Sequence, residues 1–183
     1  MSKDKEILDN ITEKEYEHGF VTNVEQEFIP KGLNEDIIRL ISAKKNEPDN
    51  ASLYYVEGNI YKELKNVEKA VESYYKCAEI NPEYEFGYIG AGILYYNLAL
   101  EYQEKATNEF DNKKYEELVE QFNQALKNAL EPFEKAYSIS KDNSLKVNVA
   151  EYLKNIYYRF SSVEDKYMQG YNKFNEYVKA NAQ

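Results

Sequence analysis

The chain has 183 residues, a formal net charge of -10, seven Gly, four Pro and one Cys. The negative charge and the scattered Lys and Arg exclude a binder of nucleic acid or of an anionic membrane surface, because both need clustered positive charge. A single cysteine excludes an internal disulfide and a cysteine zinc site. The low Gly and Pro content predicts an all-α fold that depends on helix packing.

Residues 34–48, NEDIIRLISAKKNEP, predict a helix. Asn34 is the expected N-cap, and acidic residues follow in the first turn, where the helix dipole favours negative charge. The apolar positions of this stretch share one face: Ile37, Leu40 and Ile41. We expect this face to cover Leu53 and Tyr54, which follow soon after Pro48.

A period of 34 residues relates the stretch that begins at Pro48 to the stretch that ends at Tyr95. The matched pairs are Pro48 and Pro82, Tyr54 and Tyr88, Gly58 and Gly92, and Tyr61 and Tyr95. This period is typical of a solenoid of helical hairpins. Within 51–82 the apolar residues recur at helical spacing, which predicts two antiparallel helices with a turn near Lys65 and Asn66.

The segment 51–82 resembles the tetratricopeptide repeat (TPR). That repeat has a large aromatic, a small residue and Tyr on helix A, then Ala, an aromatic, Ala and a closing Pro on helix B. The matching positions are Tyr54, Gly58, Tyr61, Ala70, Tyr74, Cys77 and Pro82. Glu57 and Cys77 depart from the expected Leu and Ala. We expect Gly58 and Ala70 to let the helices approach closely, and Cys77 to be a buried, inert thiol.

A second unit, residues 85–143, starts in phase but completes its pattern late. Its helix A positions are Tyr88, Gly92 and Tyr95, and its helix B positions are Ala129, Phe133 and Ala136. The intervening residues continue the apolar stripes, so we expect two elongated helices that project beyond the solenoid. Asp111 or Asn112 is the expected N-cap of the return helix. Pro132 should kink that helix or mark a break.

Residues 144–180 predict a third, degenerate hairpin that caps the array. It keeps the aromatic spacing but lacks the small residues; its aromatics are Tyr152, Tyr157, Tyr167, Tyr171 and Phe174. From Asn50 to the end, the chain looks like the TPR proteins of Bacteroidetes bacteria. We therefore divide the chain into a segment 1–48 and a TPR domain 49–183.

The first 48 residues differ in character, since 18 of the 19 tyrosines lie after residue 50. The stretch KEYEHGFVTNVEQEFIPKGLNEDIIRLISAKKNEP resembles the N-terminal segment of SufB, a scaffold subunit of the bacterial iron-sulfur cluster assembly complex. In that family the segment leads into a β-helical core that carries the cluster and partner contacts. Here the chain turns at Pro48 into the repeat, so no cluster ligand is carried over. The junction preserves the repeat phase, whether it arose by gene fusion or by an error of sequence assembly.

No stretch of the chain predicts a catalytic residue, a metal site or a cofactor, and we expect no enzyme. GYIGAG, residues 87–92, lies inside a predicted helix, whereas a dinucleotide loop follows a strand. His18 lacks a matched Cys, Ser or Asp and is expected at the surface or in a cap. The carboxylates alternate with Lys on helical faces, where i, i+4 pairing explains them.

The resemblance also implies a ligand-binding groove, because helix A lines the concave surface of TPR proteins. The matching positions are Tyr55, Asn59, Lys62, Phe86, Ile89, Ile93 and Tyr96. A groove of Tyr, Phe and Ile flanked by Asn and Lys favours an apolar helix or an extended peptide. The carboxylate clamp of chaperone cofactors needs Lys where Tyr55 stands, so that ligand is disfavoured.

The main hypothesis is a non-enzymatic scaffold that binds a peptide or helix in this groove and offers the projecting hairpin as a second surface. One alternative is an accessory or fragment of SufB-type iron-sulfur assembly, with Suf subunits as partners. The other is a truncated fusion relic without a dedicated partner. No apolar run is long enough for membrane insertion and no secretory signal is present, so we expect a cytoplasmic protein. The periplasm is the alternative if the junction replaced a leader.

Overall fold

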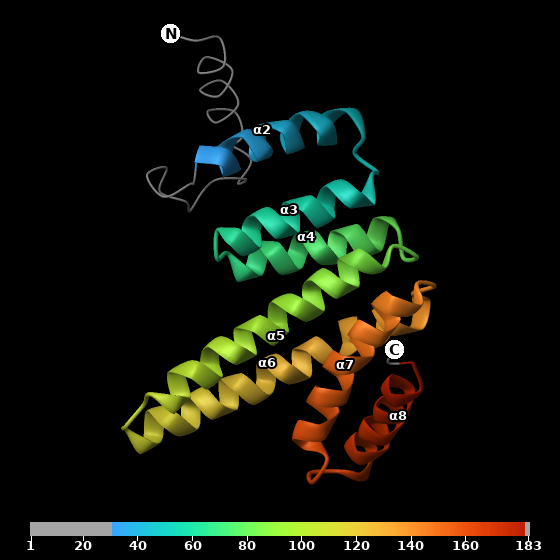
Figure 1. Ribbon diagram of the computed structural model, residues 1–183. Coiled ribbons are helices and arrows are strands. Elements are labelled where there is room, and N and C mark those ends of the chain that lie inside the picture. The colour runs from blue at the N-terminus through green and yellow to red at the C-terminus, as the bar shows by residue number, and fades with distance from the viewer. Residues whose placement is uncertain (1–30, 182–183) are drawn as a thin grey trace.

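The computed structural model describes residues 31–181 and folds them into seven α-helices (Figure 1). The helices are α2 (Lys31–Asn46), α3 (Ala51–Glu63), α4 (Val67–Ile80), α5 (Glu85–Thr107), α6 (Asn112–Ile139), α7 (Asn143–Phe160) and α8 (Asp165–Asn181). Within residues 31–181 no strand occurs. The prediction of an all-α solenoid is confirmed.

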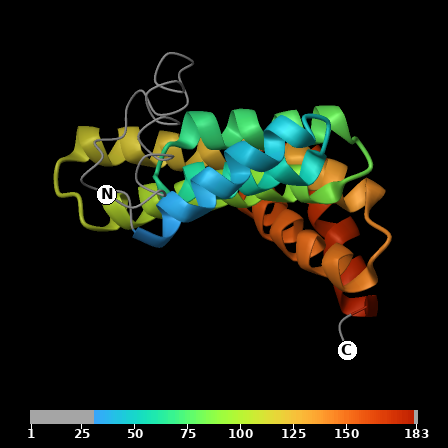
Figure 2. The same cartoon turned by 90° about the horizontal axis from the view of Figure 1, so that it is seen from above.

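Consecutive helices pack against each other, so the chain forms a stack of hairpins: α3 with α4, α5 with α6, and α7 with α8. Helix α2 packs on α3 at one end of the stack. Helices α5 and α6 have 23 and 28 residues, against 13 and 14 in α3 and α4. Their joined ends extend past the other hairpins in Figures 1 and 2, as the continued apolar stripes predict.

Side chains with short polar groups start most of these helices. Asn50, Asn66, Asp111 and Asp142 each accept a hydrogen bond from a backbone N–H in the first turn, and each satisfies a donor that the helix leaves unpaired. The expected cap at Asp111 is therefore confirmed. The expected cap at Asn34 is wrong, because α2 already includes Lys31.

The turn between α3 and α4 lies where the sequence predicts it. Lys65 has a φ of 56°, a left-handed conformation that reverses the chain, and Asn66 then caps α4. The helix α6 continues through Pro132 without a break, and that proline is fully buried. None of the described helices is long and apolar enough to span a bilayer.

The ring of Tyr74 on α4 lies between two glycines on neighbouring helices. A Cβ at Gly58 of α3 would lie 2.5 Å from Tyr74 Cδ1, and a Cβ at Gly90 of α5 would lie 2.6 Å from the same atom. Both distances are shorter than carbon atoms tolerate, so a side chain at either position would force the Tyr74 ring to shift. Tyr74 therefore sets how closely α3, α4 and α5 approach one another.

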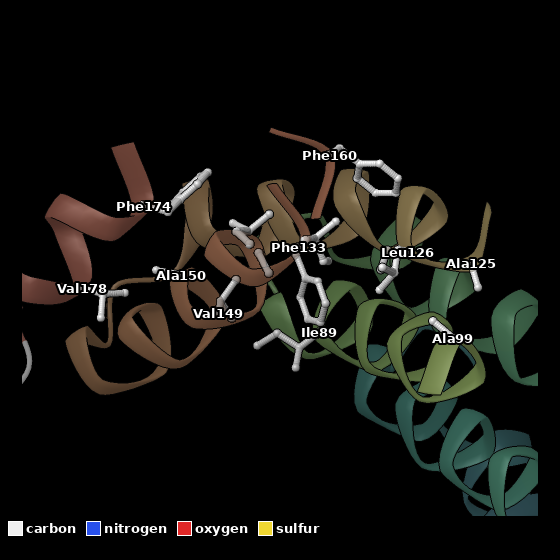
Figure 3. Close-up of a cluster of buried hydrophobic side chains, with 14 residues drawn as sticks. Ile89, Ala99, Ala125, Leu126, Phe133, Val149, Ala150, Phe160, Phe174 and Val178 are labelled. Atoms are coloured by element: carbon white, nitrogen blue, oxygen red, sulfur yellow. The ribbon is translucent and has the colours of Figure 1, made fainter. Parts of the chain in front are cut away.

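A similar contact joins α5 to α6, where a Cβ at Gly92 would lie 2.6 Å from Phe133 Cδ1. Phe133 is fully buried and belongs to a core that runs from α5 to α8 (Figure 3). The small residues Ala129 and Ala136 of α6 are also fully buried. The close approach of α5 and α6 thus depends on small residues along both helices.

The other TPR positions range from the core to the surface. Ala70 and Cys77 are fully buried, and Tyr61 is nearly so. Tyr88 and Tyr95 are half-buried against the larger core, and Pro82 is exposed after the end of α4. Tyr54 is half-buried: its hydroxyl donates to the Pro48 carbonyl oxygen at 3.0 Å, and Lys44 of α2 lies 4.4 Å from its ring centroid.

The third hairpin is less degenerate than the sequence suggests. The expectation that it lacks small residues is wrong: Ala150 of α7 is fully buried, and Gly170 of α8 faces the ring of Tyr157. A Cβ at Gly170 would lie 2.7 Å from Tyr157 Cγ. In the first hairpin the glycine lies on the first helix and the aromatic residue on the second, whereas here the order is reversed. The residues therefore do not align with the 34-residue period.

Replacing Gly90 with Ala tests the contact with Tyr74, because helix propensity and overpacking change the unfolding free energy in opposite directions. Helix propensity alone would stabilise the variant by about 1 kcal/mol, whereas overpacking costs about 1–3 kcal/mol. We expect a net loss of unfolding free energy of about 1 kcal/mol in urea denaturation. Asn97→Ala, at an exposed position of the same helix, should stay within about 0.5 kcal/mol of the parent. A Gly90→Ala chain at least as stable as the parent would contradict the contact.

Burial raises the pKa of the Cys77 thiol from its ordinary 9.0 to about 11. Because the folded pKa lies above the unfolded one, folding favours the protonated thiol, and its stabilisation is lost as the pH rises from about 9 towards 11. Between pH 8 and pH 10.5 the parent should lose on the order of 1–2 kcal/mol more unfolding free energy than Cys77→Ala. Urea denaturation at both pH values measures this difference. Equal losses in the two chains would show that the thiol titrates normally.

Candidate protein-binding surface

The predicted groove residues form two stripes on adjacent helices. Tyr55, Asn59 and Lys62 are spaced along α3 at helical intervals, and Phe86 begins the equivalent stripe on α5. Helix α3 contacts α5 directly as well as α4. The centroids of the Tyr55 and Phe86 rings are 5.7 Å apart, so the two stripes meet at this end.

Three aromatic rings form a cluster at the start of α5. Tyr84 lies 5.3 Å from Phe86 and 6.5 Å from Tyr55, measured between ring centroids. All three side chains are half-buried, so their rings contact one another and still reach solvent. Tyr55 also rests on the buried Tyr74, at 6.0 Å between centroids. The buried ring thus supports the exposed cluster.

The repeat pattern does not place Tyr84 in the groove, although the sequence around it carries a local signal. Tyr84 is the N-cap residue of α5 and makes no side-chain capping hydrogen bond. Its counterpart 34 residues earlier is Asn50, whose side chain does cap α3. An aromatic residue at a capping position indicates a role other than capping. In the structure that role is the contact with Tyr55 and Phe86.

Three of the predicted groove residues are partly or wholly engaged in the fold. Ile89 is only 7% exposed and lies in the core beside Phe133 (Figure 3), so it does not line an open surface. The Asn59 side-chain oxygen accepts a hydrogen bond from the Tyr74 hydroxyl at 2.8 Å. Lys62 keeps a third of its side chain exposed and lies 3.6 Å from the Glu63 carboxylate, so it borders the surface.

The stripe on α5 continues through Ile93 and Tyr96, which are both half-buried. The Tyr96 ring meets Tyr152 of α7 edge-on, at 4.9 Å between centroids, and Tyr152 stacks on Phe133 at 4.8 Å. Helix α5 therefore carries two groups of partly exposed rings, one shared with α3 at Phe86 and one shared with α7 at Tyr96. Tyr152, predicted only as part of the aromatic spacing, joins the second group because the third hairpin follows the solenoid.

We use the name aromatic row for the half-buried side chains that span these three helices: Tyr55, Tyr84, Phe86, Ile93, Tyr96 and Tyr152. Burial, with Cys77 and Tyr55 adding smaller contributions, raises the pKa of Tyr84. Its hydroxyl consequently stays protonated and neutral near pH 7. The row offers apolar ring faces beside neutral hydroxyl groups, a combination suited to binding another polypeptide.

The remaining candidate sites fit structural roles. Among residues 31–181 no group of three or more His, Cys, Asp or Glu side chains is placed to hold a metal ion. The GYIGAG stretch lies within α5, and its Gly87 contacts α4, where a Cβ would lie 2.9 Å from the Tyr74 carbonyl oxygen. His18 lies outside the described residues. The glycines therefore serve helix contacts, as the position inside a helix predicts.

Comparison with known proteins matches two separate parts of the chain. Residues 51–84 match the family model of the tetratricopeptide repeat. The N-terminal region is similar to proteins described as iron-sulfur cluster assembly SufBD family proteins. The Synechocystis protein is 60% identical over 40 residues, which are 22% of this chain and 8% of that protein.

Two further relatives give the same result. The Pyropia yezoensis protein is 55% identical over 42 residues, or 23% of this chain and 9% of its own length. The Trieres chinensis protein is 53% identical over 51 residues, or 26% of this chain and 10% of its own length. The chain thus spans a tenth or less of the length of these relatives. It combines a tetratricopeptide repeat with a short region that is similar to SufBD family proteins.

Proposed function

We propose that the chain is a non-enzymatic scaffold that binds a peptide or helix of another protein along the aromatic row. A tetratricopeptide repeat suggests protein–protein interaction. The observation that carries the proposal is that partly exposed rings of neighbouring helices contact one another in pairs, Tyr55 of α3 with Phe86 of α5 and Tyr96 of α5 with Tyr152 of α7. Tyrosines in such a setting are the residue type that dominates binding energy at interfaces.

The chemistry of the row indicates the kind of ligand. Ring faces and Ile93 suit apolar side chains that recur on one side of a helix or strand. The tyrosine hydroxyls donate to backbone carbonyls or polar side chains of the ligand. Because the chain carries a formal charge of -10, a ligand with basic residues around its apolar side would associate faster.

The projecting hairpin is a second surface in this proposal. Phe110, in the turn between α5 and α6, is 98% exposed, and Leu100 and Tyr115 nearby are almost half-exposed. Exposed apolar side chains on a projecting hairpin favour contact with a partner.

A second candidate function is an accessory role in iron-sulfur cluster assembly. The observation that favours it is the 60% identity over 40 residues with the Synechocystis SufBD family protein. In this alternative the N-terminal region associates with Suf subunits and brings the TPR surface to them. The described helices then act as an adaptor rather than as part of the assembly machinery.

The main proposal predicts that truncating the row weakens binding. Peptides selected from a displayed library on the full chain provide defined ligands, and calorimetry gives their affinities. Tyr55→Ala combined with Tyr96→Ala should weaken them by about 30-fold, which corresponds to a hot-spot loss of about 2 kcal/mol. Tyr158→Ala, at a 65% exposed position outside the row, should change affinity less than about twofold.

Thermal denaturation of both variants controls for folding, because Tyr55 also contacts Tyr74. Affinity is compared at a temperature where each variant remains folded. If the double variant binds the selected peptides as tightly as the parent, the aromatic row is not the binding surface. Equal weakening by Tyr158→Ala would place the ligand elsewhere on the helices.

The Suf alternative predicts binding to a purified Suf assembly complex. The full chain should bind it, and a chain without residues 1–30 should bind at least about tenfold more weakly, because the similar region is cut while all seven described helices remain. Surface plasmon resonance measures both affinities. Absence of binding by the full chain, or equal binding by both chains, would exclude recruitment through this region.

A further inference from the structure

A pocket of about 430 Å³ lies between α2 and α3, at the end of the solenoid. Its walls are mainly apolar and include Leu40, Leu53, Val56 and Ile60. Val56 is 42% exposed, the exposure of a surface residue although its side chain is apolar. Leu40 and Ile60 are themselves buried, so the apolar surface that stays open in this pocket lies at Val56 and at the half-buried Leu53. A further element of suitable shape would bury it.

The residues 34 positions after those of this pocket lie on α4 and α5, where α3 covers them. Leu40 and Val56 correspond to Tyr74 and Gly90, which are both buried. Helix α3 covers those positions, because it packs against both α4 and α5. Gly58 of α3 lies against the Tyr74 ring. The pocket between α2 and α3 is thus the place that helix A of a preceding repeat would occupy.

The other pocket positions support the same relation. Ile60 corresponds to Leu94, which is 5% exposed and clusters with Tyr61 of α3. Ala43 corresponds to Cys77, which is fully buried. Ile60 is already as buried as its counterpart, so the two repeats differ at Val56 and at the half-buried Ala43, whose counterparts Gly90 and Cys77 are buried.

Residues 17–28 lie outside the described part of the chain, 34 positions before residues 51–62 of α3. Their apolar residues recur at helical spacing on one face: Phe20, Val21, Val24 and Phe28. Ile29 and Pro30 then separate this stretch from α2, which includes Lys31. Two residues are enough to connect two antiparallel helices.

The side-chain volumes along this alignment are complementary. In the first complete repeat, a large ring at Tyr74 lies between Gly58 and Gly90. At the equivalent positions 34 residues earlier, a smaller Leu40 faces Val56 and would face Val24. Two glycines become valines where the tyrosine becomes leucine, so the smaller central side chain is matched by larger side chains on the flanking helices. Such a set fits helices that approach one another less closely than α3, α4 and α5 do.

We propose that residues 17–28 fill the pocket between α2 and α3 as the first helix of an additional N-terminal hairpin whose second helix is α2. The stretch is covalently joined to α2, so its local concentration at the pocket far exceeds that of a separate partner. The hairpin would bury Val56 and end the apolar surface of the solenoid with residues of the chain itself.

The thiol reactivity of a cysteine placed in the pocket tests this proposal on the full chain. The parent for the test carries Cys77→Ala, so that the introduced Val56→Cys is the sole thiol. We expect maleimide to react with Cys at position 56 at least about tenfold more slowly than with Cys at Val163, which is 65% exposed in the turn after α7. Reaction at equal rates would overturn the proposal.

Two further substitutions identify the occupant. Val24→Asp places a charge where the alignment predicts burial, and should raise the reaction rate at position 56 to that at position 163. Thr22→Asp is the matched control: Thr22 corresponds to Val56 and would face away from α2 and α3, so protection should persist. Protection that survives Val24→Asp, or that rises with protein concentration as for a second copy, would also overturn the proposal.

Chemical crosslinking keeps the test decisive if Val24→Asp unfolds the chain. Val21 and Ser52 correspond to Tyr55 and Phe86, whose rings are 5.7 Å apart. A chain with Val21→Cys, Ser52→Cys and Cys77→Ala should therefore give an intramolecular product with a short bis-maleimide, seen by mass spectrometry of the monomer. A control with Thr22→Cys in place of Val21→Cys should give much less product. Absence of the product from the first chain would overturn the proposal.

Discussion

The position of one aromatic ring determines much of this structure: Tyr74 lies between Gly58 and Gly90, so α3, α4 and α5 approach one another at a single point. Its hydroxyl donates to Asn59, which satisfies the polar end of an otherwise apolar contact. Burial raises the pKa of Tyr74, so the ring stays neutral. Tyr55 rests on this ring and in turn contacts Phe86. The geometry of the aromatic row therefore follows from the contact beneath it.

The same pairing of glycine with an aromatic ring recurs along the solenoid. Each such contact fixes where the next helix lies. Gly92 admits Phe133, Phe133 stacks on Tyr152, and Tyr152 meets Tyr96. Core and surface are thus linked through shared rings rather than built from separate residues. A change that moves Phe133 would alter the surface at Tyr96 without touching it, because close-packed interiors transmit displacement.

The sequence pattern predicted the helices and their close contacts because those depend on short-range periodicity. Gly58, Ala70 and Tyr74 occupy the places that the repeat requires, and continued apolar stripes predicted the long hairpin. The pattern placed Ile89 on the surface, since position within a short repeat does not reveal burial by an elongated α6 and by α7. It overlooked Gly170 because the small residue and its ring exchanged helices. The burial of Ile89 and the contact of Gly170 with its ring depend on how the helices pack in three dimensions, not on position within the 34-residue repeat.

The N-terminal region has two proposed roles: it packs in the pocket between α2 and α3, and it binds Suf subunits. A stretch that fills the pocket between α2 and α3 is unavailable to another protein until it leaves that pocket. Binding through the region similar to SufBD family proteins would then carry the cost of reopening the apolar surface around Val56. The aromatic row and the pocket share one helix, because α3 carries Tyr55 of the row and Val56 of the pocket. The packing of Gly58 on Tyr74 holds that helix in place, so release of the N-terminal stretch could affect ligand binding only by displacing α3 on this ring.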